Sequence, residues 1–438
     1  LSLNTDFAQV DLDNQVVNLT RFGIFLPEKR NFFLSGLEVL SLGRSAVEQQ
    51  LYTRRIGLDD DGPVPALGGL KLAGRPHRRV RAGALEVITR PVRDRPWTSS
   101  SVARTLVEVG SGGNVGTMLT HRQALETSDD RNTVIGLDGA WRGDGVPLVV
   151  DAYAMGSLTG ADAGEALQAT GGDGRGAWAD RLAPMASLGV SLRDVLLRPS
   201  ARYSYLHPEH RSDLGFIQRV NVHQGSAAMT FEPRIGRAGI EKVATTTEVA
   251  LTSAAEPAEL LDWRATFSGF VRWDDGYEVG AIASRREDRV LQDLPVGRDT
   301  VIPAGSYDAY VVTLYGVVPE TNIIGGSLFL TGRDFFGGEL LEASADVSFR
   351  PTTLLRLSAG AIYDRVRFDA LPDFDSVVVN SRLALGFTST LGIDVFGAYN
   401  LLSDLVRVQS RLRWIYRPGS DLFLVTQLDA ADDSGRAR

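Results

Sequence analysis

The residue types best suited to metal chemistry are the five histidines and a few short acidic runs. His207 and His210 flank Pro208 and Glu209, an order that superficially resembles a zinc motif. The helical zinc motif needs two histidines four residues apart on one helix face, whereas here the spacing is three and includes a proline. The acidic run 59–61 lacks the alternating spacing and the distal glutamate of an EF-hand loop. We therefore predict exposed loops at both places, with no bound metal and no cofactor.

No arrangement of nucleophiles or acids in the sequence predicts catalysis. The chain has no cysteine, so cysteine nucleophiles and thiolate metal sites are excluded. It contains no Gly-x-Ser-x-Gly elbow and no phosphate-binding Gly-x-x-x-x-Gly-Lys loop. The glycine-rich run 110–113 lies between two strand-like segments, so a hairpin turn explains it better. Glycosidases use paired carboxylates, but the spacing of the acids singles out no pair. We expect a protein that is not an enzyme.

Arginines that alternate with apolar residues are the most informative charged side chains. Seven of them lie on the polar face of strand-like segments: Arg264, Arg272, Arg356, Arg382, Arg407, Arg411 and Arg413. If these segments cross a membrane, an arginine on the lipid face near the midplane would cost about 2–4 kcal/mol, so the side chains should point into a lumen. They could form a basic wall that attracts anionic or sugar-like solutes, or pair with lumenal acids or with a plug. We favour the pairing.

The elements that carry these arginines are predicted from a two-residue period, which places alternate side chains on opposite faces of a strand. In 341–350, the residues Leu, Ala, Ala, Val and Phe alternate with Glu, Ser, Asp, Ser and Arg. A Pro-Thr turn follows, and the alternation resumes in 355–364, 377–388 and 406–416. The pattern predicts long antiparallel strands that are joined by short turns.

Three features favour a membrane barrel over a soluble β-sandwich. Many of the strand-like segments run for ten or more residues, whereas strands of globular proteins cluster near 5–6. Their polar face carries glycine, small residues and isolated charges of both signs, as in a barrel lumen. Trp263 and Trp273 end one apolar face, and ten residues of tilted strand rise roughly 25 Å, the height of an outer-membrane apolar band. We predict an all-β fold, a large antiparallel transmembrane β-barrel of roughly 16–20 strands.

A barrel of this width is not filled by its own strand side chains, and the first 62 residues lack the strand pattern. We therefore predict an N-terminal plug or periplasmic segment over 1–62, with a short helix near 45–50, and the barrel over 63–438, its first strand near 67–75. Four basic residues are candidates to anchor the plug to lumenal acids: Lys29, Arg30, Arg54 and Arg55. Loop-like composition at 160–176, 206–213, 285–305 and 369–375 predicts external loops.

An ordered set of motifs in the first 75 residues resembles a known family. The motifs are Asn-Thr-Asp-Phe-Ala-Gln-Val at 4–10, Val-Asn-Leu-Thr-Arg-Phe at 17–22, Pro-Glu-Lys-Arg at 27–30, Arg-Arg-Ile-Gly at 54–57 and Gly-Leu-Lys-Leu-Ala-Gly-Arg at 69–75. Together they resemble functionally uncharacterised bacterial outer-membrane barrels that often carry an upstream module resembling family-nine carbohydrate-binding domains. The resemblance implies a location and an architecture and no substrate. It also implies an aromatic-ended last strand, which the acidic tail does not supply, so we expect that strand to be missing or cut short.

The functional prediction follows from architecture and charge. A net charge of −8 argues against nucleic-acid binding, which needs a basic face. We expect a non-enzymatic channel or receptor of the bacterial outer membrane, in contact with lipid and with exported or periplasmic proteins as further partners. The alternatives are a structural membrane anchor for an exported complex and a soluble β-rich carbohydrate-active protein. The sequence leaves the solute, the exact strand number and the oligomeric state open.

Overall fold

The computed structural model describes residues 2–3, 12–59, 62–92, 95–127, 130–160, 182–418 and 420–431. Over these residues the chain is nearly all β, as the alternation predicted, and its main element is one antiparallel sheet of 22 strands. Two of these strands are short, β1 (Ser2–Leu3) and β16 (Arg234–Arg237). The other 20 are 10 to 15 residues long. Their number is even, and it agrees with the upper end of the predicted range.

The long strands follow the chain order around the sheet, and each pairs antiparallel with the next long strand from β6 to β29. Their bounds are β6 (Ala66–His77), β7 (Val80–Thr89), β8 (Thr98–Val109), β9 (Gly113–Ala124), β10 (Arg131–Arg142), β11 (Leu148–Thr159), β12 (Ala183–Leu192), β13 (Leu197–Leu206), β15 (Val222–Phe231), β17 (Ile240–Ala254), β18 (Glu259–Trp273), β19 (Glu278–Val290), β22 (Gly305–Val318), β23 (Ile324–Phe335), β24 (Gly338–Phe349), β25 (Leu355–Phe368), β26 (Phe374–Gly386), β27 (Leu391–Asn400), β28 (Leu405–Arg417) and β29 (Ser420–Ala431).

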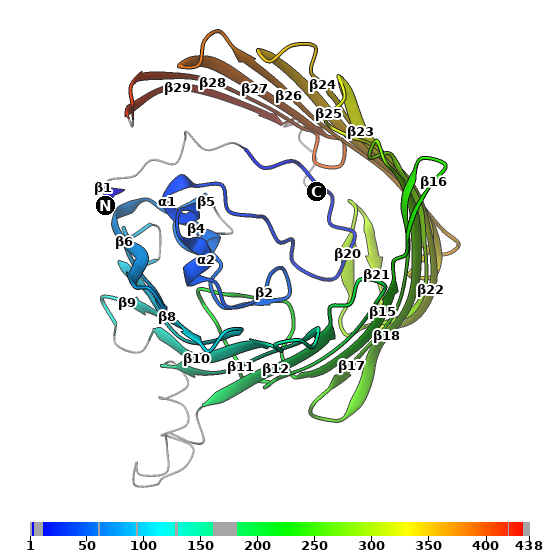
Figure 1. The fold of residues 1–438 in the computed structure, drawn as a ribbon. Coiled ribbons are helices and arrows are strands. Elements are labelled where there is room, and N and C mark those ends of the chain that lie inside the picture. Colours follow the sequence, from blue (N-terminus) through cyan, green and yellow to red (C-terminus); the bar gives the residue numbers. More distant parts are fainter. Residues whose placement is uncertain are drawn as a thin grey trace.

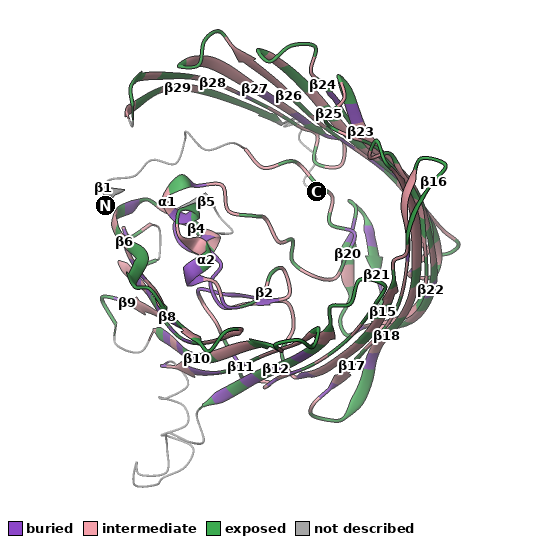
Figure 2. Cartoon of the chain, viewed as in Figure 1, coloured by how far each residue is buried: buried purple, intermediate pink, exposed green. Residues whose placement is uncertain are grey.

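The sheet curves nearly into a ring, and the N-terminal segment lies inside it (Figure 1). Alternation then gives each strand one inward and one outward set of side chains. On β24, for example, the inward Leu340 is 2% exposed, whereas the outward Leu341 and Val347 are 54% and 52% exposed. Figure 2 shows exposed and half-buried positions around the ring, with buried positions interspersed along most of its strands.

The connections at the two ends of the long strands differ in length. At one end they are short, such as 110–112 and 274–277; the first of these is the glycine-rich turn predicted from the sequence. At the other end, 207–221 contains β14 (Phe216–Ile217), and 291–304 contains β20 (Leu294–Val296) and β21 (Thr300–Ile302).

Two of the predicted loops fall on these longer connections and a third on the short connection 369–373 at the same end; the fourth, 160–176, lies almost wholly outside the described residues. Four loop bounds were wrong, two of them by a single residue, since residues 206 and 305 belong to β13 and β22. Residues 285–290 belong to β19, and 374–375 belong to β26. In β19, charged side chains occupy both faces, so the alternation of apolar and polar residues is hidden there.

The N-terminal segment forms short elements: α1 (Asn31–Leu34), α2 (Leu37–Leu40), β2 (Gly43–Arg44), β3 (Glu48–Gln49) and η1 (Thr53–Arg55). The helix predicted near 45–50 was wrong, because β3 occupies this stretch and pairs with both β2 and β14. β4 (Leu58–Asp59) and β5 (Gly62–Pro63) flank the acidic turn, of which residues 60–61 lie outside the described part. No helix in the described ranges is long and apolar enough to cross a membrane.

Two buried apolar clusters fix the segment inside the ring. The larger one joins Phe33, Leu40, Leu51 and Ile56 to inward residues of the wall strands β6–β13, β15, β17 and β18. The smaller one joins Leu19 to residues of β20–β25. The segment therefore contacts the wall through separate parts of its length.

Candidate functional site

The candidate site is the inside of the ring, which the N-terminal segment divides unequally. We call residues 26–58 the plug and residues 12–22 the strap. In Figure 1 the plug lies beside β6–β12, and the strap runs from there across the interior toward β20 and β21. The two parts differ in the kind of contacts that hold them.

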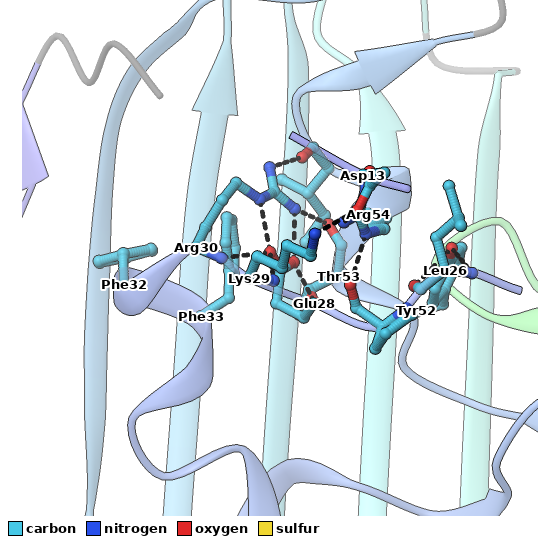
Figure 3. A network of polar contacts seen from close by, with 12 residues as sticks. Asp13, Leu26, Glu28, Lys29, Arg30, Phe32, Phe33, Tyr52, Thr53 and Arg54 are labelled. Atoms are coloured by element: carbon cyan, nitrogen blue, oxygen red, sulfur yellow. Dashed lines mark hydrogen bonds and ion pairs between the residues drawn. The ribbon is translucent and has the colours of Figure 1, made fainter. Parts of the chain in front are cut away.

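A buried ion pair organises the plug (Figure 3). Arg30 Nη2 lies 2.7 Å from Glu28 Oε2, and the two side chains are each 5% exposed. The Arg30 guanidinium also donates to the carbonyls of Thr53 and Ile56, both at 2.7 Å, and lies 4.1 Å from the centre of the Phe33 ring. Thr53 Oγ1 donates to Glu28 at 2.6 Å. The pair is thus fully hydrogen-bonded, which offsets the cost of burying two charges.

The surroundings of Glu28 set its protonation. Burial alone would raise the pKa of this carboxyl, but hydrogen bonds and charge from Arg30, with the Thr53 hydroxyl, hold its pKa below the ordinary value. Glu28 is therefore ionised at neutral pH, and its negative charge stays paired with the Arg30 guanidinium.

A second set of ion pairs joins the strap to the plug through Asp13. Arg54 Nη1 lies 2.6 Å from Asp13, and Lys29 Nζ lies 3.2 Å from it. Lys29 Nζ also donates to the carbonyl of Leu12 at 2.7 Å. Three of the four predicted anchoring residues thus bind partners in the N-terminal segment itself rather than acids of the sheet, and Arg55 is exposed.

The plug reaches the wall through buried polar residues that the sequence did not single out. Glu48 is 1% exposed and accepts hydrogen bonds from the Tyr153 hydroxyl and from Ser204 Oγ at 3.2 Å. It also pairs with Arg44 Nε at 2.6 Å. Gln50 Nε2 donates to Thr120 Oγ1 at 3.0 Å. These contacts join the plug to β9, β11 and β13.

The strap reaches the opposite wall through isolated polar contacts. The Gln15 backbone N–H donates to Asn380 Oδ1 at 2.8 Å, and Asn380 Nδ2 donates back to the Gln15 carbonyl at 3.2 Å. Farther along, Arg21 Nη2 lies 2.5 Å from Asp262 and 3.2 Å from Asp288. Arg219 pairs with the same Asp262. The strap is thus tied to β26 and β28 by hydrogen bonds near Leu12 and Gln15. It is tied to β18 and β19 by ion pairs of Arg21, beside Leu19 in the smaller apolar cluster.

A polar cavity of about 520 Å³ lies between the strap and the wall strands β24–β26. Its lining includes Asn14, Gln15, Asp346, Ser358 and Arg382. The apolar cluster that fills the plug side of the ring is absent from this lining. The ring therefore has a packed side and a polar side.

The seven arginines predicted to face a lumen lie on the face of the sheet that contacts the strap. The arginines of β26 and β28 lie an even number of residues from Asn380 and Gln409, which bond to the strap, and those of β18 lie an even number from Asp262. They therefore point to the same side of the sheet as these residues. Six pair with acids: Arg264 with Glu248 at 3.6 Å, Arg272 with Glu278 at 2.6 Å, and Arg356 with Glu320, Arg407 with Asp429, Arg411 with Asp394 and Arg413 with Asp421, each at 3.0 Å. Arg382 lines the polar cavity. Acids thus neutralise most of this wall.

The His207–His210 loop has a structural role. His210 is 4% exposed, and its Nδ1 lies 2.9 Å from the carbonyl of Ala183. Burial lowers the pKa of His210, so it stays neutral at pH 7. The prediction of an exposed loop was therefore wrong for His210. Among the described residues, no group of three or more His, Asp or Glu side chains is arranged to hold a metal ion.

Comparison with known proteins bears on the N-terminal segment. Residues 1–65 match a family model described as "Domain of unknown function (DUF5916)". No curated protein matches the chain. The matched range covers the whole plug and strap, and it fits the resemblance of these residues to an uncharacterised family.

Proposed function

We propose that the chain spans the bacterial outer membrane as a barrel and acts as a channel or receptor whose N-terminal segment obstructs the lumen. The observation that carries this proposal is the outward face of the long strands. It is apolar and exposed on nearly every long strand, for example at Leu72 (64%), Leu137 (58%), Leu314 (55%) and Leu424 (64%). Soluble monomers rarely expose apolar patches beyond a few hundred Å², whereas a bilayer covers such a band.

The inward face supports the same proposal. Its arginines pair with acids of neighbouring strands, and serine, threonine and asparagine fill positions between them. This arrangement is the reverse of a soluble β-sandwich, in which the apolar face is buried and the polar face meets water. In lipid, the backbone groups of each strand must be satisfied by its neighbours, and the antiparallel pairing does this for the long strands between β6 and β29.

We place the route for solute on the strap side of the ring. The plug side is packed by the larger apolar cluster. The strap side holds the polar cavity beside β24–β26, and only a few hydrogen bonds tie the nearby residues of the strap to the wall. Displacing residues 12–16 would enlarge this cavity along the wall, so the strap is the proposed gate.

The alternative of a structural membrane anchor is favoured by a different observation. The buried contacts of Glu48 and Gln50 with three wall strands make the plug part of the wall. A protein that only anchors a partner would need this rigidity and no passage. Measuring whether the purified protein conducts ions in planar bilayers distinguishes the channel from the membrane anchor.

Two measurements test the membrane proposal before any transport assay. The chain is purified from membranes, and its gel migration is compared with and without boiling. We expect a need for detergent and a boiling-dependent shift in migration. A monodisperse protein in detergent-free buffer would contradict the barrel and favour the soluble alternative.

The gate is tested by cross-linking two introduced cysteines, which are the only thiols that can react because the chain has no cysteine of its own. A Gln15→Cys, Asn380→Cys variant, joined by a disulfide or a short bismaleimide, should conduct poorly in planar bilayers and recover when the disulfide is reduced. The matched control is Gln50→Cys, Thr120→Cys, which joins the plug to the wall and should leave conductance unchanged. Equal conductance of the first variant before and after reduction would overturn the gate. A wild-type protein without conductance would favour the anchor.

A further inference from the structure

A cleft of about 600 Å³ lies on the outward face of the sheet, near the long-connection end of β22–β25. Its centre is Gly332, where an added side chain would meet nothing within 4 Å. The outward side chains around it are Tyr310, Val312, Asp334, Glu339, Leu341, Arg365 and Arg367. The cleft lies at the border between the apolar band and the charged ends of the strands.

Strand register arranges these side chains in two rows. Asp334 faces Glu339 across the strand pair, and Glu339 faces Arg367, which makes a charged row nearest the strand ends. Tyr310 begins this row, since its backbone N–H donates to Asp334 at 2.8 Å. In the second row, Val312 faces Gly332, Gly332 faces Leu341, and Leu341 faces Arg365. The glycine thus opens a gap in an otherwise apolar row.

Charge is divided across the cleft. Its β25 side is basic: Arg367 pairs with Asp375 at 2.7 Å, while the exposed Arg365 forms no ion pair within the part of the chain that the structure describes. Its β23–β24 side is acidic, with the exposed Glu339 beside Asp334.

An aromatic wall closes the cleft on the β22 side. There the guanidinium of Arg285 lies 5.3 Å from the ring centre of Tyr310 and 5.6 Å from that of Trp263. Aromatic residues with a polar edge are typical of the membrane–water interface.

Below the cleft, toward the middle of the strands, the outward face is shallow. Along β24, the outward Ala343 and Ala345 follow Leu341; on β25, Tyr363 faces Ala343, and the outward Ala361 and Ala359 follow it. Leu328 and Leu330 of β23 stand beside them at 48% and 45% exposure. Small residues beside large ones leave a track along the strands that leads away from the cleft.

We propose that this cleft binds one phospholipid with a zwitterionic ethanolamine headgroup. This inference rests on the proposed function, because it needs the outward face to lie in a bilayer. Arg365 would hold the phosphate, since guanidinium matches phosphate oxygens in geometry and charge. Glu339 and Asp334 would accept hydrogen bonds from the primary ammonium. One acyl chain would follow the alanine track.

The division of charge selects this headgroup over others. A purely anionic headgroup would gain from Arg365 but would be repelled by Glu339 and Asp334. A choline headgroup has the positive charge but no N–H to donate, so the carboxylates would lose their charge-assisted hydrogen bonds. One such bond is worth roughly tenfold in affinity, so ethanolamine should be preferred over choline by at least that factor.

The test is native mass spectrometry of the detergent-purified full chain after addition of phosphatidylethanolamine, phosphatidylcholine or phosphatidylglycerol with identical acyl chains. The wild type should retain phosphatidylethanolamine roughly tenfold more than either of the others. Arg365→Gln should lower this retention. Gly332→Leu should abolish it by filling the cleft without changing any charge. The matched control is Gly316→Leu, because Gly316 faces outward on the neighbouring strand β22, near the opposite end of the sheet, and an added side chain there would meet only the Glu278 carbonyl oxygen, at 4.0 Å.

The outcomes separate this inference from the proposed function. Equal retention of the three lipids, stronger retention of phosphatidylglycerol, or full retention by the Gly332→Leu variant would overturn the headgroup site while leaving the barrel intact. A folded chain that needs no detergent would overturn the barrel itself, and the site with it. Loss of retention in Gly316→Leu as well as in Gly332→Leu would show that the binding is not at the cleft.

Discussion

Replacing Arg30 by alanine should loosen the internal structure of the plug, so that the plug opens more often. The substitution leaves Glu28, whose side chain is 5% exposed, without its ionic partner, and leaves the carbonyls of Thr53 and Ile56 without their donor. Removing one partner of a buried pair costs about 3–5 kcal/mol. Thr53 and backbone N–H groups still bind Glu28, so we expect about 3 kcal/mol, which multiplies the open population of the plug roughly a hundredfold.

The open population can be measured by thiol labelling, since the chain has no cysteine of its own. Val39→Cys places one reporter on α2, where the native side chain is 5% exposed. Its labelling rate should rise roughly a hundredfold when Arg30→Ala is added, because labelling then follows the open population. The matched control is Arg55→Ala, a change of the same type in the same segment but at an exposed position, which should leave the rate unchanged. If the labelling rate of the Val39→Cys reporter in the Arg30→Ala variant stayed within twofold of the rate without this substitution, the ion pair would not be what keeps the plug closed.

Two further predictions concern pH and the lipid face. The folded-state pKa of Glu28 lies below its ordinary value of 4.5, so its contribution to plug stability is complete above pH 4.5 and is lost as the pH falls through the lowered value. Pepsin should therefore cut the plug faster as the pH drops below 4.5. The Glu28→Gln variant should show a weaker dependence on pH. Leu314→Arg puts a charge on the outward face and should cost about 2–4 kcal/mol of folding stability in lipid vesicles if it lies near the midplane, whereas Thr313→Arg, on the inward face, should cost at most about 1 kcal/mol. A soluble protein would tolerate Leu314→Arg, and urea titration of the folded gel band distinguishes the cases.

The strands and their faces could be predicted because they depend on a local pattern. The alternation in 341–350 assigned the inward and outward sides of β24, and the structure places Leu341 outward and 54% exposed. The same parity argument placed the strand arginines on the face that contacts the strap. It did not work in 285–290, where Arg285 and Glu287 point outward and Arg286 and Asp288 point inward, so both faces are charged.

The partners of the N-terminal segment could not be predicted, because they are distant in sequence. Arg21 meets Asp262 across 241 positions, and Gln15 meets Asn380 across 365. No periodicity relates such residues. The ion pair between Glu28 and Arg30 could have been proposed from the sequence, since the two residues are only two positions apart. Spacing alone, however, does not distinguish a buried ion pair from a solvated charged turn. Burial, which comes from the apolar cluster around the plug, decides that.

The anchors of the strap differ in strength, and this difference identifies the moving part. Leu19 is 7% exposed within the smaller apolar cluster, and Arg21 and Asp262 are 13% and 15% exposed, so this end is fixed. The other end meets the wall through hydrogen bonds of Leu12 and Gln15. Asp13, which is 28% exposed, joins this end to Lys29 and Arg54 of the plug, and partly exposed ion pairs contribute little and weaken with salt. Residues 12–16 should therefore leave the wall by turning about the fixed end at Leu19 and Arg21. If the strap is the gate, the passage should open more readily at high ionic strength, while the buried pair that locks the plug should hold.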